Sequence, residues 1–100
     1  MNDLESTLKL IFHAVETKML DELRSAEQKF PGWPDDIVHA SAIVAEEAGE
    51  LVKAALDRHY GRAADDDELI REGVQTAAMA LRFLLNLKLK KEQKKWPIIP

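Results

Sequence analysis

The chain divides at a short stretch that cannot be helical, Phe30-Pro31-Gly32-Trp33-Pro34. Proline lacks the backbone N–H that a helix interior needs, and its ring clashes with the preceding turn, so this stretch ends one helix. Asp35 and Asp36 follow directly. Aspartate is a favoured N-cap because its carboxylate accepts hydrogen bonds from the first free N–H groups of a helix. The stretch therefore predicts one helix before residue 30 and a second that starts at about residue 36.

Three long helices are predicted around this break. In the first, from about residue 3 to 28, apolar residues recur at steps of three and four as in an amphipathic helix: Leu4, Leu8, Ile11, Phe12, Val15, Met19 and Leu23. The second runs to about His59, and Gly61 suits a left-handed C-cap. The third opens at the acidic residues 65–67 and ends in a lysine run. Long helices with short connections predict an all-α, antiparallel helical bundle.

The composition predicts one helical domain over residues 1–100, with a lysine-rich helix end and a non-helical tail at 88–100. Glycine and proline are scarce, at four each, and cysteine is absent, so disulfides and thiolate chemistry are excluded. No run approaches the roughly 20 apolar residues of a membrane span, and the acidic start lacks the pattern of a signal peptide. We expect a cytoplasmic protein without a membrane partner.

The net charge and the length of the chain indicate which binding partners to expect. The net charge is −4 and the lysines cluster near the C-terminus, so the body of the protein is acidic. An acidic body repels a nucleic acid polymer and attracts divalent cations. Because a 100-residue chain buries a limited share of its surface, we expect a homodimer or homotetramer that completes the bundle.

Carboxylates gather on two of the predicted helices. Glu46, Glu47 and Glu50 lie within an arc of about 100° on the second helix. On the third helix, Glu72 and Gln75 are three residues apart and hence neighbours. If the two arcs face each other, four or five oxygen atoms converge, which suits Mg²⁺ or Mn²⁺.

The alternative is a solvated acidic face. The opposite side of the second helix could form a core by itself, with Ile37, Val44, Ala48, Leu51 and Ala55. Against this, Ile43 and Ala54 fall inside the acidic arc, where a solvated face would carry polar residues.

Other residues are candidates for contacts with a phosphorylated ligand, each with a plainer structural alternative. Trp33 can stack on a base or anchor its loop, and His39 can contact phosphate or remain a polar surface residue. The remaining candidates are Lys53, Arg82 and Asn86.

A family resemblance narrows these options. Residues 44–54, Val-Ala-Glu-Glu-Ala-Gly-Glu-Leu-Val-Lys-Ala, resemble the metal-binding helix of the MazG-like, all-α nucleoside triphosphate pyrophosphohydrolases. That family pairs Glu-Glu-x-x-Glu with a downstream Glu-x-x-Asp, and here 21 residues separate Glu50 from Glu72. The likeness covers roughly residues 33–87. It departs from the family at Gln75, which stands where the family has aspartate and so removes one negative charge.

The resemblance implies a metal-dependent hydrolysis of a nucleoside triphosphate, expected to be a deoxynucleotide, to monophosphate and pyrophosphate. It implies that Glu47, Glu50 and Glu72 bind Mg²⁺ or Mn²⁺, with Gln75 at a further ligand position, and that Glu46 or Glu47 accepts the proton of the attacking water. Two alternatives stay open: a non-catalytic helical binding or regulatory protein, and an enzyme of the same fold that acts on a phosphoribosyl-nucleotide.

Overall fold

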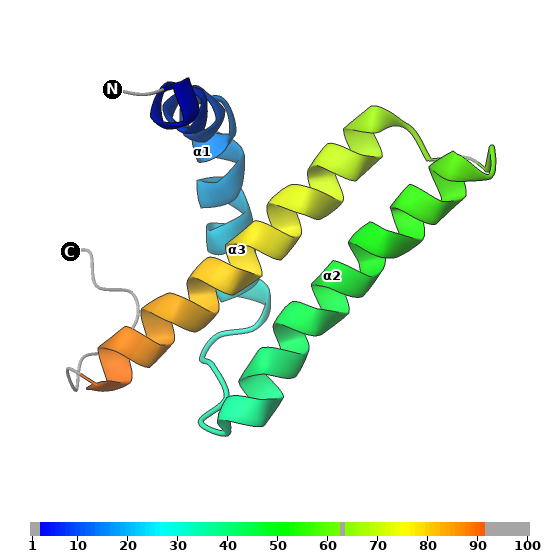
Figure 1. The fold of residues 1–100 in the computed structure, drawn as a ribbon. Coiled ribbons are helices and arrows are strands. Elements are labelled where there is room, and N and C mark those ends of the chain that lie inside the picture. The colour runs from blue at the N-terminus through cyan, green and yellow to red at the C-terminus, as the bar shows by residue number, and fades with distance from the viewer. Residues whose placement is uncertain (1–2, 63, 92–100) are drawn as a thin grey trace.

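The computed structural model describes residues 3–62 and 64–91, which form three helices: α1 (Asp3–Lys29), α2 (Ile37–His59) and α3 (Asp66–Lys91) (Figure 1). The predicted all-α class and all three helices are confirmed, with bounds that differ by a few residues at most. The described residues contain no strand. Of the predicted lysine-rich helix end and non-helical tail at 88–100, residues 88–91 belong to the third helix, and residues 92–100 lie outside the described residues.

The helix ends follow the predicted chemistry. Asp36 caps α2, because its side chain accepts hydrogen bonds from the backbone N–H groups of Val38 and His39. Asp65 does the same for α3, where its Oδ1 accepts from the N–H of Glu68 at 2.8 Å. Gly61 follows α2 with a φ of 72°, a left-handed conformation that costs glycine little.

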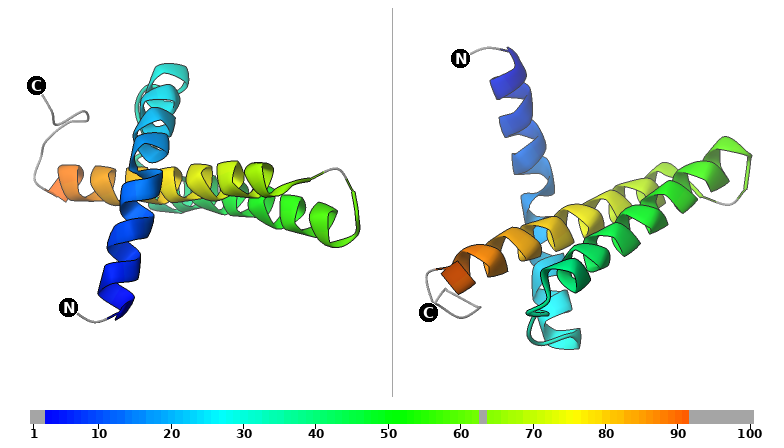
Figure 2. Two further views of the ribbon diagram at one scale, coloured as in Figure 1. Left: turned by 90° about the horizontal axis from the view of Figure 1, so that it is seen from above. Right: turned by 60° about the horizontal axis from the view of Figure 1, so that its bottom comes forward.

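The helices are arranged around α3. Helices α2 and α3 lie side by side and antiparallel, whereas α1 crosses α3 steeply, and its N-terminal half extends beyond the other two helices (Figure 2). Along this half, Leu4, Ile11 and Phe12 are each more than half exposed. No described helix combines the length and apolar character needed to cross a membrane.

The core lies where α1 crosses α3. Leu23 of α1 packs against Ala78 and Met79 of α3, and four partly buried residues surround them: Ala26, Trp33, Ile43 and Val44. Helix α2 buries only part of the face that could have formed a core by itself, since Val44, Ala48 and Leu51 are half-buried, whereas Ile37 is 56% exposed and Ala55 is also exposed. Its buried residues are Ala40 and Ala54, which lie in or beside the acidic arc. The acidic arc of α2 therefore borders the interior.

Arg82 fixes the loop between α1 and α2 onto α3. It is buried, and its Nη2 donates to Glu27 Oε2 at 2.9 Å, to the carbonyl oxygen of Phe30 at 2.5 Å and to that of Gly32 at 2.9 Å. Its guanidinium carbon also lies 5.1 Å from the centre of the Trp33 ring. This single side chain therefore joins the end of α1, the proline-containing loop and α3.

We expect Arg82→Met to lower the free energy of unfolding by about 3 kcal/mol, because the substitution leaves a partly buried carboxylate and two carbonyl groups without their donor. Urea unfolding followed by circular dichroism measures the loss. Arg71→Met is the matched control: among the described residues, Arg71 forms an exposed pair with Glu68 at 3.5 Å, and its removal should change stability by less than about 0.5 kcal/mol. Equal losses in both variants would contradict the anchoring role.

Candidate metal and nucleotide site

Glu47 lies at the centre of the α2 face that packs on α3. At about 100° per residue, Ile43 and Ala54 lie about 20–40° to one side of it and Ala40 about 20° to the other. These neighbours are buried or partly buried, and Glu47 itself is half-buried. Glu46 and Glu50 lie at the edge of this face and are exposed. The three glutamates of the motif therefore have different surroundings, and Glu47 is the one held between helices.

Thr76 joins the two motifs. Its hydroxyl oxygen lies 3.1 Å from the backbone carbonyl oxygen of Glu47 on α2 and 2.8 Å from that of Glu72 on its own helix, so its proton can be donated to either. The contact holds the Glu47 turn of α2 alongside the Glu72 turn of α3. Sequence reasoning did not single out Thr76, since a threonine in a helix carries no distinguishing signal.

The electrostatic surroundings of Glu47 and Glu72 are unfavourable for negative charge. Burial raises the pKa of Glu47 above its ordinary value of 4.5, and the negative charges of Glu72, Glu50, Glu22 and Glu46 raise it further. One carboxylate oxygen of Glu72, Oε2, is buried without a hydrogen-bond partner among the described residues. A buried carboxylate oxygen without a donor is costly, and a cation is one of the few groups that would satisfy it.

The predicted arcs of α2 and α3 thus come together at Glu47 and Glu72. Gln75 is half-buried near this junction. Within residues 3–62 and 64–91, no three histidine, aspartate or glutamate side chains converge closely enough to form a ready-made metal site. Metal coordination by Glu47, Glu50, Glu72 and Gln75 stays a prediction.

A pocket of about 690 Å³ opens beside Glu47. It lies between the proline-containing loop, α2 and α3, and it is lined by Phe30, Pro31, Gly32, Trp33, Pro34, Asp35, Asp36, His39, Ile43, Glu46, Glu47, Met79 and Arg82. Its volume is within the range of pockets that hold small ligands, and its wall combines apolar residues with the acidic residues Asp35, Asp36, Glu46 and Glu47. Trp33 and His39, both predicted ligand contacts, belong to this wall.

The other predicted contacts have different positions. Arg82 reaches the pocket wall, although its Nη2 is engaged by the protein, and its buried Nε has no partner among the described residues. Asn86 donates to the carbonyl oxygen of Arg82 at 2.8 Å and lines a separate pocket of about 70 Å³. Lys53 is exposed on α2 and is not part of the large pocket. Ligand contacts by these three residues stay predictions.

Glu22 of α1 is a member of the cluster that sequence reasoning missed. It is half-buried and is one of the four carboxylates whose charge raises the pKa of Glu47. Its only sequence signal is its position directly before Leu23, the last member of the apolar stripe of α1. That position marks Glu22 as lying near an interface but does not say which helix it faces.

We expect Glu47→Gln to stabilise the protein at neutral pH when EDTA removes divalent cations. Because the pKa of Glu47 is raised by folding, its ionised form disfavours the folded state above that pKa. The destabilisation disappears below pH ~4, where the carboxyl group is protonated in both states. In urea unfolding, the free energy of unfolding of Glu47→Gln should therefore exceed that of the unsubstituted protein at pH 7, and this difference should vanish as the pH falls.

Glu16→Gln controls for the loss of one acidic side chain, since Glu16 is exposed on α1. It should change the unfolding free energy little at either pH. A Glu47→Gln variant that is less stable than the unsubstituted protein at pH 7 would contradict the electrostatic cluster.

No protein-family model, no curated protein and no solved structure matches this chain.

Proposed function

We propose that the protein is a metal-dependent nucleoside triphosphate pyrophosphohydrolase that releases a nucleoside monophosphate and pyrophosphate, with deoxynucleotides as the expected substrates. The observation that carries the proposal is the position of Glu47, a half-buried residue whose turn of α2 is held against the Glu72 turn of α3, beside a pocket of about 690 Å³. A merely solvated acidic face would leave both motifs in water. Burying like charges together is unfavourable unless a cation compensates them.

The donor set fits a hard divalent cation. The residues concerned offer only oxygen atoms, from Glu46, Glu47, Glu50 and Glu72 and from the amide of Gln75, and no thiol is available because the chain lacks cysteine. Mg²⁺ and Mn²⁺ prefer such donors and readily bind substrate phosphates as well. The partnerless Oε2 of Glu72 supports the same assignment.

The pocket suits a base next to phosphates. Trp33 offers an aromatic face, already backed by the guanidinium of Arg82, while Ile43 and Met79 contribute apolar surface. Glu46 and Glu47 line the same pocket, so a nucleotide seated against Trp33 could extend its phosphates toward the carboxylates. Phosphates would approach these acids only with cations between them, which is why we expect an absolute metal requirement.

The reaction adds water across one phosphoric anhydride bond. The water oxygen forms a bond to phosphorus, the bond between that phosphorus and the bridging oxygen to its neighbour breaks, and the proton leaves to a base. Bound Mg²⁺ or Mn²⁺ would neutralise phosphate charge and increase the acidity of the attacking water. Glu46 is the candidate proton acceptor, because it is exposed at the pocket wall and lies outside the more buried Glu47–Glu72 pair.

The test is pyrophosphate release from a panel of ribo- and deoxynucleoside triphosphates with Mg²⁺ or Mn²⁺. We expect activity that EDTA abolishes, and we expect Glu50→Gln and Glu72→Gln each to lower it at least a hundredfold with unchanged helicity, because each removes a metal-binding charge.

Glu68→Gln is the matched control, the same substitution one turn earlier on α3, at a residue that forms an exposed pair with Arg71. It should retain activity within about threefold. Absence of pyrophosphate release from every nucleotide would reject the proposal. Nucleotide binding without turnover would then favour the helical binding protein, and hydrolysis of phosphoribosyl-nucleotides alone would favour the other enzyme.

We further propose that a second copy of the chain covers the apolar stripe of α1. Leu4, Leu8, Ile11 and Phe12 are 67%, 44%, 52% and 59% exposed, on a helix half that extends beyond the rest of the molecule. Burying a large apolar side chain contributes about 1.5–3 kcal/mol, so pairing two such stripes would provide a substantial driving force. The outcome would be a homodimer, or a homotetramer if two dimers associate.

Sedimentation equilibrium tests the assembly. We expect a mass of at least two chains for the unsubstituted protein, and a shift toward the single-chain mass of 11.3 kDa for the double variant Leu8→Glu and Phe12→Glu. Thr17→Glu introduces one such charge on the opposite side of α1 and should leave the assembly intact. A monomeric unsubstituted protein would refute a stable assembly.

A further inference from the structure

We propose that Glu22 of α1 supplies to the metal site the negative charge that Gln75 lacks. This inference rests on the proposed metal-dependent function and deepens it, because it adds a third helix to a site otherwise built from α2 and α3. The two motif helices provide four carboxylates, and the fifth position is a neutral amide. A carboxylate from another helix could restore the charge, and the position of Glu22 makes it the candidate.

Gln75 lies on the part of α3 between its two partner helices. On one side, about 60° and 100° around the helix, are Ala78 and Val74, which face α1. On the other side, at similar angles, are Glu72 and Thr76, and Thr76 contacts α2. A side chain at position 75 therefore lies where α1, α2 and α3 meet.

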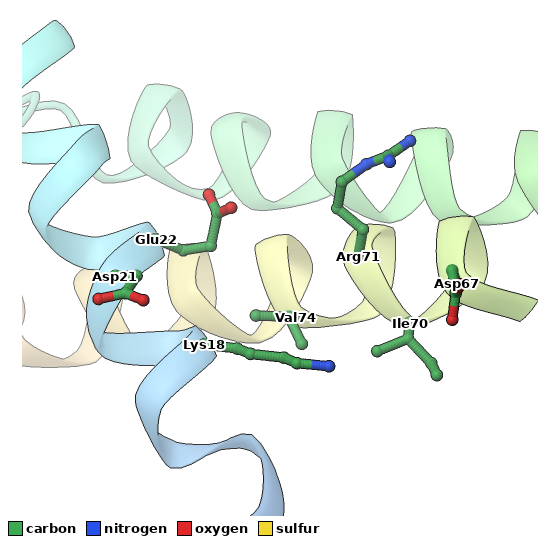
Figure 3. A pocket seen from close by; sticks show the side chains of 7 residues that line it. All are labelled: Lys18, Asp21, Glu22, Asp67, Ile70, Arg71 and Val74. Atoms are coloured by element: carbon green, nitrogen blue, oxygen red, sulfur yellow. The ribbon is translucent and has the colours of Figure 1, made fainter.

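Glu22 extends toward this junction. Leu23, the next residue, packs on Ala78 and Met79, one turn beyond Gln75 on α3. Figure 3 shows that the Glu22 side chain points from α1 toward the side on which α2 lies, whereas Asp21 points the other way. Glu22 also lines a pocket of about 330 Å³ between α1 and α3, together with Val74.

Electrostatic surroundings agree with this placement. Glu22 is half-buried and, among residues 3–62 and 64–91, forms no ion pair. Lys18 and Arg71 line the same pocket and are the rival partners. If either neutralises Glu22 in solution, removing the Glu22 charge will leave metal binding unaltered.

Isothermal titration with Mn²⁺ distinguishes these possibilities without relying on catalysis. Glu22→Gln should weaken Mn²⁺ binding at least tenfold, because it removes a negative charge close to the ion. The decisive variant is Glu22→Gln combined with Gln75→Asp. It restores the number of negative charges at the junction and should return the affinity to within about threefold of the unsubstituted protein.

Asp21→Asn is the matched control, since it removes one charge from the same turn of α1 but from a side chain that points elsewhere. It should leave Mn²⁺ binding within about twofold. Equal effects of Glu22→Gln and Asp21→Asn, or failure of Gln75→Asp to rescue Glu22→Gln, would overturn the inference. If Glu22→Gln loses helicity, Glu22→Ala replaces it. This variant also removes the charge, and unchanged Mn²⁺ affinity in it would equally count against the role.

The same titrations separate this inference from the proposed function. An unsubstituted protein that binds no Mn²⁺, or binding that survives Glu50→Gln and Glu72→Gln, would reject the metal site itself. Binding that depends on Glu50 and Glu72 but is indifferent to Glu22 would reject only the contribution of α1.

Discussion

The close pairing of α2 and α3 is the constraint on which the rest of the molecule depends. Two small residues, Ala40 and Ala54, are buried on the face of α2 that packs on α3, and the Thr76 hydroxyl contacts the carbonyl groups of Glu47 and Glu72. This pairing encloses a carboxylate that would otherwise remain in water. The raised pKa of Glu47 and the partnerless Oε2 of Glu72 are two consequences of that enclosure.

A second constraint orients the pocket. Arg82 is buried in α3, yet its donors reach the end of α1 and the carbonyl groups of the loop before α2. The loop is thereby held with Trp33 over the guanidinium and beside Met79, which gives the pocket one aromatic wall. Arg82 thus fixes the position of the loop that lines the pocket, independently of any contact with a ligand. Arg82 was predicted as a contact for phosphate because of its charge, but the contacts it makes in the structure are mainly with backbone carbonyl groups of the loop.

These two constraints connect stability with the proposed chemistry. Like charges held between helices weaken the protein when no cation is bound, and under the proposed function the same charges would provide the affinity for a cation. The interior is correspondingly small, since the buried apolar residues among those described are Leu23, Ala40, Ala54, Val74, Ala78 and Met79. Much apolar surface of α1 remains exposed, so a second copy of the chain would also contribute to stability.

The sequence by itself determined the three helices, because proline, aspartate and glycine act locally on the backbone and apolar periodicity needs no tertiary context. It also determined which glutamates share an arc of α2. Only the tertiary structure decided that Glu47 lies inside and Glu46 and Glu50 at the edge, since helical geometry fixes a direction relative to the axis but not the side on which a partner helix packs. The steep crossing of α1, and with it the proximity of Glu22 to Glu47, likewise arose from packing between residues far apart in sequence.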